Sequence, residues 1–135
     1  MTESVGTIQF KQQALNQILQ EACQEGQFAA AVLASLEGFL IAAASPAPTG
    51  DAEIVAAMVA YLRDAAQRAR TQLGLSPLDE LVIRDQDNHL VVCRSFAVDD
   101  KNTLILMVLA PGRQAYRRLT NIAIQRICTI WQSSP

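Results

Sequence analysis

The spacing of apolar residues first predicts a helix from about Ile8 to Glu25. Apolar side chains recur there at i, i+3, i+4, i+7 and i+8, the spacing that places them on one side of a helix. The stripe consists of Leu15, Ile18, Leu19, Ala22 and Cys23. Gly26 follows it and is expected to end the helix as the residue after the cap.

The period then changes in the stretch FAAAVLASLEGFLIAAA, from Phe28 to Ala44. Apolar residues continue almost without a polar break on both sides of Glu37-Gly38, where the glycine can take a positive φ. This pattern predicts a hairpin of two short strands, Phe28–Leu36 and Phe39–Ala44. A loop with Pro46 and Pro48 follows.

A second helix is predicted from Ala52 to Leu73, capped by Thr49 or Asp51 and ended by Gly74. Its first half, AEIVAAMVAYL, is apolar on nearly all sides, so we expect it to be buried on more than one side. Its second half carries arginines and glutamines around a narrower apolar face.

Three more strands and a last helix complete the pattern: Leu81–Ile83, His89–Phe96, Thr103–Ala110 and Gln114–Trp131. The order α-β-β-α-β-β-β-α predicts an α+β fold with a five-stranded antiparallel sheet between helices. The two most apolar strands should be central, and the charged strand at Leu81 should lie at an edge. The expected core includes Val32, Leu40, Val82, Val92, Ile105, Met107 and Leu109.

Composition narrows the class of protein. The 135 residues fit one domain, 1–135, with its core at about 8–131. A net charge of −2 and a pI near 5.3 argue against nucleic-acid binding. The start of the chain has no signal-peptide pattern and no apolar run is long enough for membrane insertion, so we expect a cytoplasmic protein. Cys23, Cys93 and Cys128 are far apart, which favours buried free thiols over a metal or redox site.

A catalytic set is not apparent in the sequence. The only histidine, His89, adjoins an acidic turn, where a solvated side chain is the expected role. The glycines form neither GxxxxGK[ST] nor GxGxxG, so no nucleotide cofactor is expected. Asp85 and Asp87 could ligate calcium, but the spaced ligands of an EF-hand loop are missing, so we favour a plain polar turn there and at Asp99-Asp100.

Three arginines, Arg113, Arg117 and Arg118, gather at the start of the last helix. An arginine donated in trans can stabilise the charge that develops in GTP hydrolysis. Surface arginines are more often a solvated face, and a helix start is slightly unfavourable for cations. We therefore expect no catalytic residue, and interpret the protein as a non-enzyme.

Several segments together resemble a known family. They are the helix ending at Gly26, AAAVLASLEGFLIAAAS, AAMVAYLRDAAQRA, TQLGLSPLDELVI, VVCRS and TLILMVLAPG, before a final helix. In this order they resemble the Roadblock / dynein light chain domain family, with its profilin-like architecture, and in particular its bacterial members that accompany Ras-like small GTPases. The resemblance covers about Leu15 to Ile130.

This resemblance implies a homodimer in which the second helices and third strands meet across a two-fold axis and the two sheets join. It also implies a scaffold or regulator of a Ras-like small GTPase, since some members speed GTP hydrolysis. The expected dimer interface consists of Val55, Val59, Leu81, Val82, Ile83 and Arg84. The expected contact with the GTPase uses Arg63, Gln67 and Arg70, on the side of the second helix that we expect to be exposed.

An alternative is a small-molecule sensor that holds a ligand between sheet and helix. Such a pocket usually adds a few convergent polar groups to apolar walls. The expected core offers none, which favours the interaction module.

Overall fold

A computed structural model describes residues 5–44, 51–112 and 115–133 of the chain. Its elements follow the predicted order, with boundaries that shift by no more than a few residues. They are α1 (Val5–Gly26), β1 (Ala30–Ser35), β2 (Leu40–Ala44), α2 (Ala52–Leu73), β3 (Leu81–Arg84), β4 (His89–Ala97), β5 (Thr103–Pro111) and α3 (Tyr116–Gln132). The predicted α+β class is therefore confirmed.

The five strands form one antiparallel sheet in the order β2-β1-β5-β4-β3. Strand β5, the most continuously apolar segment, is central, and β1 lies beside it, as predicted. Strand β3 lies at one edge, also as predicted, and β2 lies at the other.

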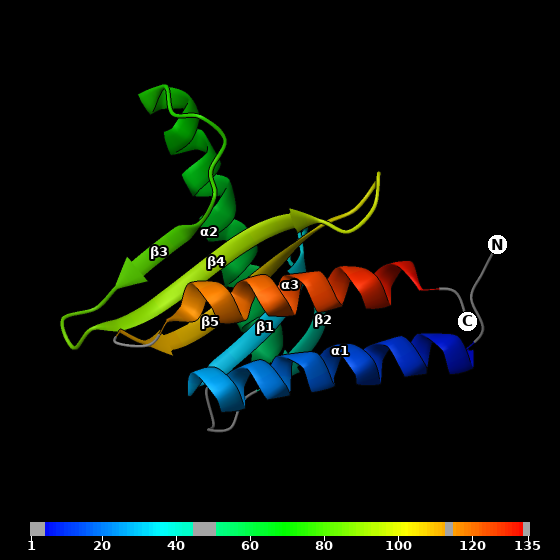
Figure 1. The fold of residues 1–135 in the computed structure, drawn as a ribbon. Coiled ribbons are helices and arrows are strands. Elements are labelled where there is room, and N and C mark those ends of the chain that lie inside the picture. The colour runs from blue at the N-terminus through cyan, green and yellow to red at the C-terminus, as the bar shows by residue number, and fades with distance from the viewer. Residues whose placement is uncertain (1–4, 45–50, 113–114, 134–135) are drawn as a thin grey trace.

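Helices cover both faces of this sheet (Figure 1): α1 and α3 lie side by side on one face, and α2 lies on the other. Side chains alternate between the two faces along each strand. On β4, Leu90 and Val92 enter the core beneath α1 and α3, whereas Cys93 enters the core beneath α2. Each face of the sheet thus has its own apolar core.

The ends of α1 and α2 test the capping residues predicted from the sequence. Asp51 caps α2 by accepting a hydrogen bond from the Glu53 N–H at 2.9 Å, and Gly74 ends it with a φ of 70°. The alternative cap, Thr49, lies outside the described residues. At the end of α1 the prediction for Gly26 was wrong: the helix includes Gly26, and Gln27 takes the positive φ of 55°.

One member of the expected core was also placed wrongly. Val82 is 39% exposed, because β3 is an edge strand and only β4 borders it in the sheet. Leu40 and Leu109 are half-buried, and Val32, Val92, Ile105 and Met107 are buried as expected.

Candidate protein-interaction surface

Helix α2 carries an apolar stripe that the described chain leaves open. Ala56, Val59 and Ala60 are buried against the sheet. On another side of the helix Ile54, Met58 and Tyr61 are 60%, 56% and 76% exposed. Ile54, Met58 and Tyr61 are spaced by four and three residues, so they form one continuous stripe along the helix. The helix predicted to be buried on more than one side is buried on one side in a single chain.

A cavity of about 330 Å³ runs beside this stripe, between α2 and the sheet. Its walls are apolar: Val55 and Met58 come from α2, Val91 and Met107 from the sheet, and Ile83 from the edge strand. Helix α2 packs over the β1 and β2 side of the sheet, so the β3 and β4 side of this face is less covered. The cavity and the stripe together form one surface, which we call the α2–β3 surface.

The edge strand β3 borders the α2–β3 surface and has a defined set of outward backbone groups. The Asp85 N–H donates to the His89 carbonyl at 3.0 Å, so this pair points inward, toward β4. Inward and outward pairs alternate in an antiparallel ladder, and β3 pairs with β4 without a register shift. The N–H and C=O of Val82 and Arg84 therefore point away from β4.

The structure brings most of the expected interface residues together. Val55, Val59 and Ile83 line the same cavity, and half-buried Leu81 packs against the core beneath α2. The side chains of Val82 and Arg84 alternate with these and point to the face of α1 and α3, so their part in an interface would come from their backbone groups. That these residues contact a second chain stays a prediction.

The expected partner-binding residues, Arg63, Gln67 and Arg70, lie on one side of α2, but all three are half-buried and so do not lie on its fully exposed side. The Nε atoms of Arg63 and Arg70 are buried and have no hydrogen-bond acceptor among the described residues. Arg63 forms a long ion pair with Asp64, at 4.0 Å. Both arginines therefore have a donor left for another acceptor.

The acidic turn beside His89 has a structural explanation. Asp85 accepts hydrogen bonds from the backbone N–H groups of His89 and Asp87, at 2.8 and 2.9 Å, and its other oxygen lies 2.9 Å from the His89 Nδ1. The backbone hydrogen bond from His89 is the main cause that lowers the pKa of Asp85. His89 is exposed, as predicted. Asp85, Asp87 and His89 could reach one metal ion, but all three are exposed, and the carboxylate of Asp85 and the imidazole of His89 already contact one another.

Arg117, near the start of α3, is held by two carboxylates. Arg117 pairs with Asp79 at 2.7 Å and with Glu80 at 2.9 Å, and the hydrogen bond to Asp79 raises its pKa. Arg118 is exposed, and Arg113 lies outside the described residues. The contacts of Arg117 hold the segment before β3 against α3, which is a structural role.

The cysteines match the expectation of buried thiols in two of three positions. Burial raises the pKa of both Cys23 and Cys93 to about 11, which disfavours the reactive thiolate. Cys128 is half-buried and its pKa is also raised by burial.

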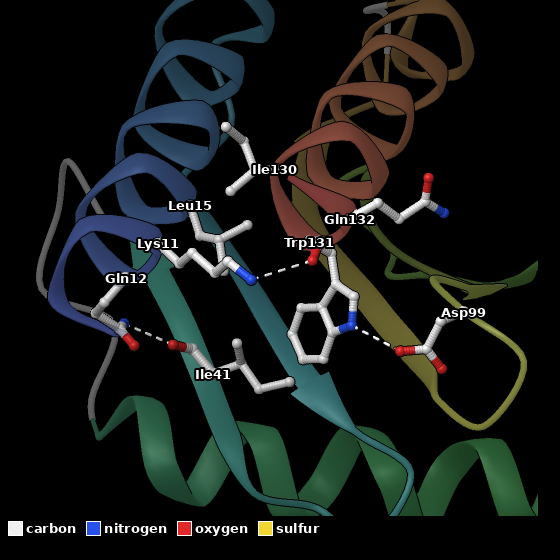
Figure 2. Close-up of a pocket in the computed structure, with 8 residues that line it drawn as sticks. All are labelled: Lys11, Gln12, Leu15, Ile41, Asp99, Ile130, Trp131 and Gln132. Atoms are coloured by element: carbon white, nitrogen blue, oxygen red, sulfur yellow. Dashed lines mark hydrogen bonds between the residues drawn. The ribbon is translucent and has the colours of Figure 1, made fainter. Parts of the chain in front are cut away.

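A second cavity, of about 400 Å³, lies between the ends of α1 and α3 (Figure 2). Its polar groups are engaged within the chain: the Trp131 indole N–H donates to Asp99 at 3.0 Å, and the Lys11 ammonium donates to the Trp131 carbonyl at 3.3 Å. Gln12 donates to the Ile41 carbonyl at 2.6 Å. The polar groups of Lys11, Gln12 and Trp131 that border this cavity therefore already have hydrogen-bond partners within the chain.

None of the helices in the described part of the chain is both long and apolar enough to cross a membrane. Fold and surface together define a small α+β domain that carries, among the described residues, an exposed apolar surface beside an edge strand. A family description agrees: the Roadblock/LC7 domain matches residues 15–110, and the chain belongs to this family.

Solved structures of low sequence identity share the fold. MglB of Myxococcus xanthus is 15% identical, with a TM-score of 0.75 over 89% of this chain and 96% of that one. The gliding protein MglB of Thermus thermophilus is 16% identical, with a TM-score of 0.72 over 96% and 93%. A Roadblock/LC7 domain of Streptomyces avermitilis is 17% identical, with a TM-score of 0.68 over 86% and 93%. No curated protein matches the sequence.

Proposed function

We propose that the chain is a non-enzymatic homodimer that binds a Ras-like small GTPase and regulates or scaffolds it. The observation that carries the dimer is the α2–β3 surface, where exposed apolar side chains of α2 adjoin an apolar cavity and an open strand edge. Membership of the Roadblock/LC7 family supports the same proposal.

A second copy of the chain fits this surface better than a small ligand does. Its α2 would supply a matching apolar stripe, and its β3 would supply the backbone partners that an open edge needs. The cavity lining is apolar throughout, whereas a ligand site normally adds a few polar groups. We expect the dimer to bury at least about 1,000 Å² in total.

A regulatory role is favoured over catalysis by the state of the reactive side chains. His89 is exposed and engaged with Asp85, Arg117 is engaged with two carboxylates, and Cys23 and Cys93 are buried thiols. Roadblock domains are in general regulatory domains without a reaction of their own.

The GTPase contact is proposed at Arg63, Gln67 and Arg70, with both protomers contributing. The buried Nε atoms of the two arginines favour an acceptor from another chain, because a buried donor without a partner costs about 1–3 kcal/mol. A switch region that is ordered only by the γ-phosphate would make binding depend on the nucleotide. We therefore expect the GTP state to bind more tightly than the GDP state.

The test uses the full chain and the Ras-like small GTPases encoded in the same genome. Binding is measured with GDP and with a non-hydrolysable GTP analogue, and hydrolysis is measured with GTP, for the wild type and for Arg63→Glu/Arg70→Glu. Arg68→Glu, a charge reversal at an exposed position of the same helix, is the matched control. We expect the double variant to bind at least about tenfold more weakly while it stays dimeric. Equal binding in both nucleotide states, or equal loss in the control, would refute the proposed contact.

A further inference from the structure

The two edges of the sheet differ in how their outward backbone groups are satisfied. At the β2 edge, the side chain of Gln12 donates to the Ile41 carbonyl at 2.6 Å, and that of Asn16 accepts from the Ala43 N–H at 3.2 Å (Figure 2 shows the first). Ile41 and Ala43 are two residues apart, so these backbone groups point to the same side of the strand. Both are bound from α1 and not from another strand.

The spacing along α1 matches the spacing along β2. Gln12 and Asn16 are four residues apart and therefore lie on one side of the helix, close to one another. One amide offers its N–H to a carbonyl and the other offers its oxygen to an N–H, which is the alternation that a neighbouring strand would present. The register of β2 with β1 also shifts between Leu33 and Ala34, so this edge is irregular.

The β3 edge has none of these features. It pairs with β4 in regular register from Leu81 to Arg84. Within the described residues, no side chain makes a hydrogen bond to the outward groups of Val82 or Arg84. Natural proteins close exposed edges with coverage, bulges or charges, and an edge left regular and open is a template for another strand.

We propose that Gln12 and Asn16 close the β2 edge, so that the sheet can be extended at β3 only and strand pairing between copies stops at two chains. A sheet that was open at both its β2 and β3 edges could pair with further copies at each edge, which would give an open-ended series of sheets without a closing symmetry. The pairing at β3 rests on the proposed dimer. The closure of β2 rests on the hydrogen bonds of Gln12 and Asn16 and does not need the dimer.

The test removes both amides in Gln12→Ala/Asn16→Ala. The matched control, Gln13→Ala/Gln20→Ala, removes two exposed amides of the same helix. Mass is measured by light scattering over a range of concentrations, and strand content by circular dichroism. We expect the test variant to form strand-rich species larger than a dimer as concentration rises, and the control to behave as the wild type.

A second measurement separates edge closure from a general loss of stability. The Ala43 amide should exchange with solvent about fivefold faster in Asn16→Leu than in Asn16→Asp, because the aspartate keeps the acceptor. Both variants are compared in a Val82→Pro background as well, where the proposed dimer is disrupted. Unchanged Ala43 exchange together with an unchanged mass of the double variant would overturn the proposal. A monomeric wild type with fast Ala43 exchange only in Asn16→Leu would contradict the dimer and support the closed edge.

Discussion

Replacing Val82 by proline tests the proposed dimer at a single backbone group. The Val82 N–H points away from β4, so the monomer's own ladder does not use it. Proline lacks this donor and is tolerated at strand edges where the N–H faces solvent. The variant should therefore fold as a monomer and fail to pair.

The expected size of the effect follows from the two-fold symmetry. Each protomer loses one N–H donor, so two interchain hydrogen bonds are lost and two carbonyls lose their partner. Each lost hydrogen bond, together with its unpaired carbonyl, costs about 1–3 kcal/mol, so the free energy of dimerisation becomes less favourable by about 2–6 kcal/mol. The dissociation constant of the dimer should therefore increase by a factor between roughly 30 and about 10⁴.

Sedimentation equilibrium from nanomolar to micromolar concentration measures this change. Val82→Ala keeps the N–H and should stay dimeric, which separates the backbone from the side chain. Ile83→Pro removes an N–H that faces β4, so it should lower the melting temperature of the monomer itself. If Val82→Pro remains a dimer of unchanged affinity, the edge-to-edge arrangement is wrong.

Three further variants test the surface, the core and a turn. Met58→Asp places a charge in the proposed interface and should yield a monomer with a thermal stability close to that of the wild type at limiting dilution, measured by light scattering and calorimetry. In Gly26→Ala the added methyl would come within 2.5 Å of the Phe28 ring; this overpacking costs about 1–3 kcal/mol against a helix-propensity gain of about 1 kcal/mol, so urea unfolding should show a net loss. Hydrogen bonds from Asn102, the backbone and the Trp131 indole lower the pKa of Asp99 to about 2 from 3.8, so its stabilisation is present above about pH 4 and is lost as the pH falls toward 2. Asp99→Asn should flatten that part of the pH dependence in urea titrations, and an unchanged slope would contradict the assignment.

The sequence by itself determined the elements and the layers. Helical spacing placed α1, α2 and α3, continuous apolar runs placed β1 and β5 at the centre, and the charges around Leu81 placed β3 at an edge. These signals are local, because side-chain period and turn chemistry depend on neighbouring residues. The same local signals also placed Gly74 at the end of α2 and left Thr49 and Asp51 as its two candidate caps, of which Asp51 is the one observed.

Tertiary structure alone decided which side chains stay exposed and which backbone groups are bound. The sequence showed an apolar α2, but only the packing reveals that Ile54, Met58 and Tyr61 stay open beside the cavity. The proposed role of Gln12 and Asn16 at β2 depends on contacts across more than twenty residues of chain. Such contacts follow from how helices dock on the sheet, and no local period records them, because the partner groups are far apart in sequence.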